Sequence, residues 1–282
     1  MPEIISAQHS GFCEGVSAAY KTAVLTAQKG QNVFMLGNLV HNTQVVDKLK
    51  DLGIKVLSSL SEIPQNATGS LLISAHGVAP HIYEEAEKKG LNIIDTTCSW
   101  VKRAQKIAKE MGKKGMTVVI VGDEGHPEVK GLIGWAGKNS VVIENPEEAS
   151  DLDFISFFQP QVGVVAQTTQ SEDNFNSIVA ELKKHLKDLE VHNTICGATE
   201  KRQKAAVELA RGVDLMLVIG DQKSANTKRL TELCSKTGTE THQIQTAKEL
   251  DPQWLKGKGK VGLTAGASTP DWVVEEVVRV VR

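Results

Sequence analysis

Residues 95–135 read DTTCSWVKRAQKIAKEMGKKGMTVVIVGDEGHPEVKGLIGW, and the order of features in this stretch decides the fold that we predict. Cys98 lies at the start of a helical pattern, an apolar strand follows at 116–121, and the polar loop GDEGHPEVKG comes directly after that strand. Strands that alternate with helices are typical of βαβ units and parallel sheets. The stretch therefore predicts an α/β unit with a thiol at a helix start and acid–base side chains, His126 and Glu128, at a strand end.

The same arrangement occurs three times along the chain. Three cysteines lie in short loops rich in Gly, Ser or Thr before a helical pattern; they are Cys13, Cys98 and Cys196. Twenty-eight residues after each cysteine the chain reaches a polar loop, at His41, His126 and Ser224. A second polar loop follows another apolar run in each unit, at His76, Thr168 and Ser268. This repeat is longer than a solenoid unit and suits three small α/β units around a shared centre. Coincidence among Gly-rich loops is the alternative.

The repeat sets the predicted domain boundaries at the cysteines. The predicted domains are residues 14–97, residues 98–195, and residues 196–282 together with 1–13. The predicted strands are residues 3–8, the runs that end at His41 and His76, the run that leads to Cys98, and then 116–121, 140–143, 161–166, 190–194, 214–219, 241–244 and 260–264. Helices are predicted after Cys13, from Thr43 to a stop at Gly53, over 81–90, and over 99–113, 128–136, 171–187, 198–211, 225–236 and 270–281.

Composition is that of an ordinary globular protein. The chain has 282 residues, a formal net charge of −2, 40% hydrophobic residues and 23% charged residues. The absence of a net basic charge argues against a nucleic-acid or anionic-membrane partner. The sequence has no apolar run near the ~20 residues of a membrane span and no secretory signal pattern, so we expect a cytoplasmic location.

Three thiolates from three repeat units suit an iron–sulfur cluster, although such clusters usually have four cysteine ligands. Three ligands would leave one iron open to a substrate oxygen, where a metal acts as a Lewis acid. The alternatives are a three-cysteine zinc site and three unconnected buried thiols. The sequence has no CxxC pair, which argues against a zinc ribbon. The fourth cysteine, Cys234, shares a helical face with Leu230 and Leu233, and we predict that it is a packed core thiol.

The polar loops offer hydrogen-bond donors for an anionic group such as a diphosphate. The candidates are His41, His76, Ser224, Asn226, Ser268 and Thr168. Glu128 is the best-placed acid for proton transfer, and its alternative role is a carboxylate stabilised by a helix dipole. The sequence has neither a Walker loop nor a GxGxxG motif after a strand, so a nucleotide is not the expected ligand.

With these residues identified, the chain resembles the LytB family of 4-hydroxy-3-methylbut-2-enyl diphosphate reductases, which catalyse the last step of the methylerythritol phosphate route to isoprenoids. The matching segments span nearly the whole chain in the family's order: GFCEGV, LVHNTQVV, SAHGVAP, DTTCSWV, GDEGHPEVKG, QTTQS, TICGATEKRQ, SANTKRL and TAGASTP. SAHGV, GHPEV and TAGAS taken together are highly specific for this family.

The resemblance implies a cloverleaf of three α/β domains, with pseudo-threefold symmetry, around a central [4Fe–4S] cluster held by Cys13, Cys98 and Cys196. In the family that the chain resembles, the open iron binds the substrate hydroxyl, and two electrons and two protons remove it as water. The products are isopentenyl and dimethylallyl diphosphates. Glu128 would relay the proton, with His126 and Thr168 ordering the hydroxyl end. The diphosphate ligands would be His41, His76, Ser224, Asn226 and Ser268. Reduced ferredoxin or flavodoxin would supply the electrons.

One position departs from the family pattern. Where the family usually has Ser-Ser-Asn, this chain has Ser224, Ala225 and Asn226. The loss of one hydroxyl donor predicts a raised KM with the chemistry retained. Two other classes remain open at this point: a three-cysteine [4Fe–4S] dehydratase of the quinolinate synthase kind, and a non-enzymatic iron–sulfur redox sensor or carrier.

Overall fold

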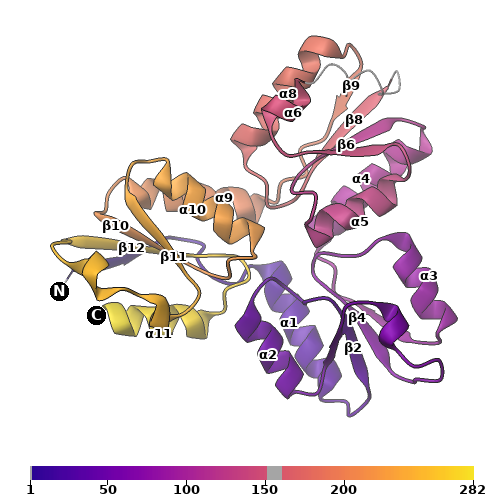
Figure 1. Ribbon diagram of the computed structural model, residues 1–282, viewed down its shortest axis with the longest axis horizontal. Helices are drawn as coiled ribbons and strands as arrows, with labels where there is room; N and C mark the ends of the chain where they lie inside the picture. Colours follow the sequence, from indigo (N-terminus) through magenta and orange to yellow (C-terminus); the bar gives the residue numbers. More distant parts are fainter. Residues whose placement is uncertain (1, 151–160) are drawn as a thin grey trace. The chain divides into compact units, whose positions relative to one another are not determined.

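The computed structural model describes residues 2–150 and 161–282, and within these residues twelve strands form three parallel sheets of four strands each (Figure 1). The predicted α/β class with parallel sheets is therefore confirmed. The chain divides into two compact units. Unit 1 comprises Met1–Ser17, Val40–Lys48 and Gly197–Arg282, and unit 2 comprises Ala18–Leu39 and Leu49–Cys196.

The first sheet of unit 2 has the strand order β3-β2-β4-β5. Its strands are β2 (Val33–Leu36), β3 (Lys55–Leu57), β4 (Ser70–Ile73) and β5 (Asn92–Asp95), and the helices connected to it are α1 (Glu14–Ala27), α2 (Thr43–Asp51) and α3 (Pro80–Lys88). Phe34 and Leu71 are register partners, and both pack with Ala86 of α3 on one face of the sheet. This face also contacts Leu60 of the short 3₁₀ turn η1 (Leu60–Glu62).

The second sheet of unit 2 has the order β7-β6-β8-β9 and carries helices on both faces. Its strands are β6 (Thr117–Val121), β7 (Ser140–Ile143), β8 (Val162–Ala166) and β9 (Leu189–Val191), and its helices are α4 (Ser99–Lys113), α5 (Pro127–Ala136), α6 (Pro146–Ala149) and α8 (Glu172–His185). Every residue of β6 and β8 is buried. Continuous Val and Ile runs are typical of parallel strands that are covered on both sides. Here α4 and α5 cover one face, and α6 and α8 cover the other.

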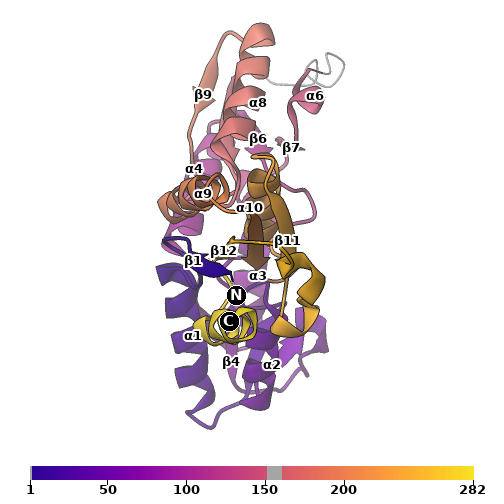
Figure 2. The ribbon, with the colours of Figure 1, turned by 90° about the vertical axis from the view of Figure 1, so that its left-hand side faces the viewer.

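The sheet of unit 1 is built from both ends of the chain, which lie in this unit in Figure 2. Its order is β1-β12-β10-β11, with β1 (Glu3–Ser6), β10 (Leu215–Ile219), β11 (Glu240–Ile244), β12 (Lys260–Ala265) and the helices α9 (Gly197–Ala210), α10 (Ala225–Ser235) and α11 (Asp271–Val281). Helices α9 and α10 pack on one face, and α11 packs on the other.

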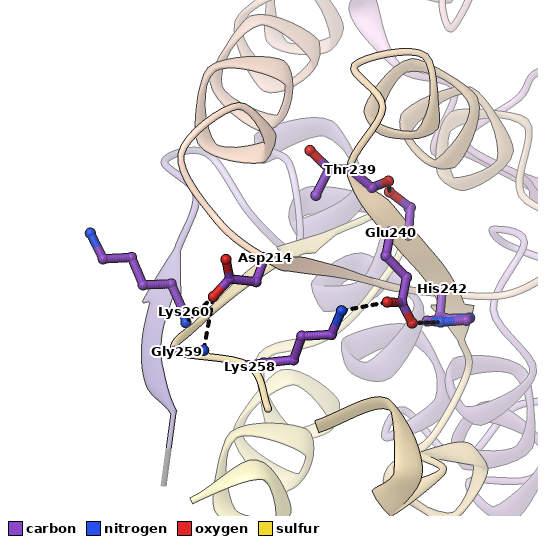
Figure 3. Close-up of polar contacts among 8 residues, drawn as sticks. Asp214, Thr239, Glu240, His242, Lys258, Gly259 and Lys260 are labelled. Atoms are coloured by element: carbon purple, nitrogen blue, oxygen red, sulfur yellow. Dashed lines mark hydrogen bonds and ion pairs between the residues drawn. The ribbon is translucent and has the colours of Figure 1, made fainter. Parts of the chain in front are cut away.

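Polar contacts fix the start of β12 beside β10 and β11. The Asp214 carboxylate accepts hydrogen bonds from the backbone N–H groups of Gly259 and Lys260, each 2.8 Å long (Figure 3). The ammonium group of Lys258 pairs with Glu240, whose other carboxylate oxygen contacts His242. The loop that enters β12 is thus tied to the start of its neighbour β10 and to the start of β11, the strand on the far side of β10.

The three sheets share one topology. In each, the strand that follows the cysteine-led helix (β2, β6 or β10) pairs with the next strand of the chain on one side and with the third strand (β4, β8 or β12) on the other. A fourth strand completes the sheet next to the third, and in unit 1 that fourth strand is β1. The first and third strands are parallel, but the order in which the chain adds strands reverses between them, and such switch points are where open α/β sheets bind ligands.

Several predicted boundaries were wrong. The strands expected to end at His41 and His76 end earlier, at Leu36 and Ile73. Gly37 adopts a φ of 66° directly after β2, a left-handed conformation that does not continue a strand. The short strand β3 and the helix α6 were not predicted. The division into domains at 14–97, 98–195, and 196–282 plus 1–13 stays a prediction, although each of these spans contains one of the three sheets.

Candidate functional site

Each of the three repeated cysteines is tied to the loop that follows the third strand of a sheet. The backbone N–H of Cys98 donates to Ala75 C=O over 3.1 Å. The N–H of Cys196 donates to Thr168 C=O over 3.0 Å, and that of Cys13 donates to Ala267 C=O over 3.2 Å. In every case the acceptor lies two residues after the end of the strand, β4, β8 or β12. The sequence repeat therefore corresponds to a repeated hydrogen bond that holds a cysteine at a strand end.

The position and chemistry of these cysteines fit thiolate ligands of an iron–sulfur cluster. Cys13, Cys98 and Cys196 are half-buried and directly precede the helices α1, α4 and α9. A helix N-terminus stabilises a thiolate, and the Val16 N–H lies 3.4 Å from the Cys13 sulfur as a donor. Iron–sulfur clusters are held by such thiolates, so the donor set suits a cluster with three cysteine ligands.

Cys234 has a different environment, as predicted. It is fully buried between α9 and α10, together with Ala206 and Leu230. Burial raises the pKa of its thiol to about 12, so it remains protonated at neutral pH. Cys234 is thus a core side chain and is unsuited to metal binding.

Glu128 in unit 2 is a buried carboxyl group held by one partner residue. Its side chain is 1% exposed, although Glu is rarely buried without a paired charge. The backbone N–H and the hydroxyl of Thr168 donate to its two oxygens at 2.6 and 2.8 Å. Burial raises the pKa of Glu128 to about 7, against the lowering effect of the Thr168 hydrogen bonds. The carboxyl group can therefore both hold and release a proton near neutral pH.

His126 is the N-cap of α5 and positions the first turn that carries Glu128. Its Nδ1 accepts the backbone N–H of Glu128 over 3.1 Å. Since Nδ1 is the acceptor, the neutral ring carries its proton on Nε2. His76 lies next to this ring, with centroids 5.2 Å apart in an edge-on arrangement. Glu128, His126 and Thr168, which were predicted to act together, and His76, which was predicted as a diphosphate ligand, are thus linked by a chain of contacts in unit 2.

The sequence analysis missed the residues that hold this group in place. The Gln167 side chain accepts the Asp123 N–H at 2.9 Å and donates to Thr169 Oγ1 at 2.8 Å. Gly122 leaves room for it, because a Cβ there would lie 2.8 Å from Gln167. Gln167 thus links the loops after β6 and β8. In the sequence analysis it appeared only as part of the QTTQS segment.

In unit 1, three of the predicted diphosphate ligands lie together. Ser224 is the N-cap of α10, where its hydroxyl accepts the Thr227 N–H at 3.3 Å. The Ser268 hydroxyl donates to the His41 carbonyl at 2.9 Å and lies 3.5 Å from the Ser224 hydroxyl. His41, His126 and Ser224 each lie five residues after a strand end, at Leu36, Val121 and Ile219. This common offset explains the repeated spacing from the cysteines.

Asn226 is the clearest sign of a polar ligand in unit 1. The side chain is 3% exposed, and neither its amide nitrogen nor its oxygen has a hydrogen-bond partner among the described residues. A buried polar group without a partner costs about 1–3 kcal/mol. An anionic ligand at the start of α10 would provide the missing acceptor for the amide N–H groups.

The segment that carries His41 is fixed by Asp221, a second residue that the sequence analysis did not identify. The Asp221 carboxylate accepts the N–H and the hydroxyl of Thr43, at 3.0 and 2.7 Å. Burial is the largest influence on His41 and lowers the pKa of its imidazole, while Asp221 partly opposes this effect. A neutral imidazole can still donate one hydrogen bond to a phosphate oxygen. The sequence signal for Asp221 was the pair Gly220-Asp221 after an apolar run, which repeats the pair Gly122-Asp123.

Ala225, the departure from the family pattern, occupies the first position of α10 between Ser224 and Asn226. It is half-buried, so a serine hydroxyl at this position would lie at the same helix start. Of the predicted site residues, unit 1 therefore holds His41, Ser224, Ala225, Asn226, Ser268 and Cys13. Unit 2 holds His76, His126, Glu128, Thr168, Cys98 and Cys196. That both sets act on one ligand stays a prediction.

No helix among the described residues has both the length and the apolar character needed to cross a membrane.

Known proteins resemble this chain over nearly its whole length. The model of a family described as LytB protein matches residues 4–282. The 4-hydroxy-3-methylbut-2-enyl diphosphate reductase of Geobacter metallireducens is 44% identical over 280 residues, which cover 99% of this chain and 97% of that protein. The protein of the same name from Caldanaerobacter subterraneus subsp. tengcongensis is 42% identical over 283 residues, covering 99% and 96%.

Two solved structures are similar over the whole chain. The E-1-hydroxy-2-methyl-but-2-enyl-4-diphosphate reductase of Plasmodium falciparum has a TM-score of 0.92 and 30% identity, with 99% of this chain and 87% of that chain covered. The structure of an (E)-4-hydroxy-3-methyl-but-2-enyl diphosphate reductase, described as the terminal enzyme of the non-mevalonate pathway, has a TM-score of 0.69 and 39% identity. The similarity covers 100% of this chain and 99% of the chain in that structure.

Proposed function

The chain belongs to the LytB family, and from this premise we propose that it reduces 4-hydroxy-3-methylbut-2-enyl diphosphate to isopentenyl and dimethylallyl diphosphates. The reaction consumes two electrons and two protons, breaks the terminal C–O bond and releases water. This is the last step of the methylerythritol phosphate route to isoprenoids.

The observation that carries the proposal is the environment of Glu128. A hydroxyl group leaves far more readily as water than as hydroxide, so the reaction needs a proton donor close to the leaving oxygen. Glu128 is buried, has a pKa of about 7 and is held by both donors of Thr168. A donor whose pKa lies near the working pH is efficient in proton transfer.

In this proposal Glu128 holds the proton on its carboxyl group, and Thr168 fixes the direction in which that group points. His126 orders the turn that carries Glu128 through its bond to the Glu128 N–H. The protonated Nε2 of His126 and the neighbouring His76 ring are further hydrogen-bonding groups for the hydroxyl and phosphate ends of the substrate. Burial excludes bulk water from the carboxyl group and disfavours its charged form, so a large fraction of Glu128 remains protonated at neutral pH.

The diphosphate is assigned to the residues at the start of α10 and around Ser268. Asn226 supplies amide N–H donors that have no other partner among the described residues. Ser224, Ser268 and the neutral imidazole of His41 supply further donors, and the positive end of α10 favours the negative charge. His76 of unit 2 was also predicted as a diphosphate ligand, and this assignment remains part of the proposal.

We propose that Cys13, Cys98 and Cys196 hold a [4Fe–4S] cluster, which fits their half-buried helix-start positions. When bound, such a cluster supplies electrons and an iron with an open position for an oxygen ligand. Reduced ferredoxin or flavodoxin is the proposed electron donor, and the cytoplasm, where such carriers operate, is the proposed location.

Anaerobic turnover tests the reductase proposal. The reconstituted chain is mixed with 4-hydroxy-3-methylbut-2-enyl diphosphate and a reduced viologen dye. Dye oxidation and the two five-carbon products are then measured. We expect turnover by the unchanged chain and a decrease of about 10²–10⁴-fold in kcat for Glu128→Gln, the usual contribution of general acid catalysis. A cluster-loaded chain that leaves the substrate unchanged would contradict the proposal.

The other two classes predict different results in the same assay. A dehydratase would eliminate water without consuming dye, and a redox sensor would be reduced once by the dye and form no product. Relatives that are 42–44% identical over almost the full length and are named as reductases favour the reductase over both.

A further inference from the structure

Unit 2 contains a second cavity that the proposed reaction does not use. It has a volume of about 390 Å³ and is formed by α3, the end of β5, α4 and α5. Ligand pockets commonly have volumes of about 300–1,000 Å³. The cavity is therefore large enough for a small organic molecule, and the residues that line it indicate which kind.

The walls combine apolar ring surfaces with positive charge. Tyr83 and Trp135 form one wall, with ring centroids 6.3 Å apart. Lys102, Lys106 and Lys109 line the cavity from one face of α4. Such walls suit an anion that has an apolar or planar body.

The charges do not cancel within the cavity. Lys102 is paired with Asp95 at 2.7 Å, which leaves Lys106 and Lys109 to set the net charge. Lys106 has only a 4.0 Å contact with the exposed Glu110, and Lys109 lies 4.7 Å from the centroid of Trp135. Two exposed ammonium groups, of which that of Lys109 lies beside an aromatic ring, favour a negatively charged head group.

Gln105 provides an independent sign of a ligand. Its side chain lines the cavity and is 5% exposed. Its Nε2 is buried and has no hydrogen-bond partner among the described residues. A buried amide donor is rarely left unsatisfied. The Nε2 lies against Gly77, and a rotation of the Gln105 side chain would bring it to an anionic or carbonyl oxygen in the cavity.

We propose that this cavity, termed here the α4 pocket, binds a small amphiphilic anion: an apolar or aromatic body with a phosphate or carboxylate head. The body contacts Tyr83 and Trp135. The head interacts with Lys106, Lys109 and the Gln105 amide.

The walls of the α4 pocket are also joined to two segments of the proposed reductase site. The Trp135 indole N–H donates to Val78 C=O at 2.9 Å, two residues after His76. Gly77 has a φ of 69°, and a Cβ there would overlap the Gln105 amide, so this amide lies directly against the His76 loop. The Asp95 carboxylate accepts the N–H of Thr97, the residue before Cys98. If the chain has the proposed function, occupancy of the pocket alters its kinetics through these contacts.

Calorimetric titration of the full chain tests binding without any need for turnover. The probes are 1-naphthyl phosphate and 1-naphthoate, with inorganic phosphate and 1-naphthol as head-only and body-only controls. We expect one site per chain for a naphthyl anion, with both controls at least tenfold weaker. The relative affinities of 1-naphthyl phosphate and 1-naphthoate show whether the pocket prefers an organic phosphate or a carboxylate. Absence of binding by both at millimolar concentration would overturn the proposal.

Matched variants locate the site. Lys109→Glu and Gln105→Leu should each weaken binding of the naphthyl anion at least tenfold, whereas Lys113→Glu should leave it unchanged. Lys113 is an exposed lysine on the same helix and does not line the cavity. Equal weakening by Lys113→Glu would show a nonspecific charge effect and overturn the proposal. Loss of binding in Asn226→Ala alone would also overturn it, because the probe would then occupy the proposed diphosphate site.

The kinetic link is tested separately. A saturating naphthyl anion should change KM or kcat at least twofold in the unchanged chain and have no effect in Lys109→Glu. Binding without a kinetic change would overturn the link to the His76 loop. Failure of the reductase assay would not affect the titration, so the two proposals can be distinguished.

Discussion

At the scale of single residues, the burial of Glu128 has a consequence for stability. In the folded chain its pKa is about 7, against 4.5 for an ordinary glutamate. Between these values the folded state holds a proton that the unfolded state has released, so stability falls as the pH rises through this window. The free energy of unfolding should fall by at most about 3 kcal/mol and level off above pH 7. Urea unfolding at pH 5, 6, 7 and 8 measures this slope.

The Glu128→Gln variant should lack that decrease, because the amide does not titrate and can still bond to Thr168. Glu84→Gln is the matched control, since Glu84 is an exposed glutamate in the same unit. We expect the control to retain the wild-type pH dependence. An equally steep decrease in Glu128→Gln would show that another group is responsible.

Ala225 permits a second test at this scale. Ala225→Ser restores a hydroxyl at the first position of α10, beside Ser224 and Asn226. A hydrogen bond to a charged group contributes about 1.5–3 kcal/mol, so KM should fall about tenfold or more while kcat changes little. Ala225→Val adds volume without a donor and should not lower KM. Unchanged substrate affinity in Ala225→Ser would mean that a backbone N–H or a water already serves there.

At the scale of helices, strands and loops, the elements that the sequence predicted best are those with a clear hydrophobic pattern. Strands such as β6 and β8 are continuous apolar runs, and helix α10 begins directly after Ser224, a residue type that is preferred at helix N-caps. The short strand β3 was missed because its three residues, KVL, are only partly buried and give no clear alternation. The side-chain bonds of Gln167 and Asp221 depend on loops that are distant in sequence, so no local pattern could reveal them.

The loop after β4 gives the prediction at this scale. Gly77 and Gly90 both have a φ of 69°, but a Cβ at Gly77 would overlap Gln105, whereas a Cβ at Gly90 would meet nothing within 4 Å. Both Gly→Ala changes should incur the cost of a left-handed alanine, about 1 kcal/mol. Gly77→Ala should cost about 1–3 kcal/mol more, because it also overpacks a buried contact. Denaturant unfolding measures the difference, and equal losses would show that Gln105 moves aside freely.

At the scale of the whole molecule, one topology used three times explains the distribution of the candidate residues. Each sheet has its switch point between neighbouring strands, β2 and β4, β6 and β8, or β10 and β12. The loops after these strands carry the polar side chains, and the third-strand loops also hold the cysteine N–H groups. Repetition thus supplies three thiols and three pairs of polar loops, whereas the side chains at equivalent positions differ: Glu128 and Thr168 in one copy, Asn226 and Ser268 in another.

The sheet of unit 1 includes the first residues of the chain, and this gives the last prediction. Strand β1 pairs with β12, and the contacts continue through Ala7 N–H to Leu263 C=O and Cys13 N–H to Ala267 C=O. Ile4 packs against the core of this sheet. Ile4→Asp should therefore destabilise unit 1 by about 1–3 kcal/mol, because it removes an apolar contact and places a charge at a half-buried position. It should also lower the iron content after reconstitution.

Amide hydrogen exchange measures which strands Ile4→Asp destabilises. Amides of β10 and β12 in unit 1 should lose protection, whereas those of β4 and β8 in unit 2 should keep it. Ser6→Asp adds the same charge at an exposed position of the same strand and should have little effect. A uniform loss of protection in both units would show that the chain unfolds as one cooperative body, because β1 belongs to the sheet of unit 1.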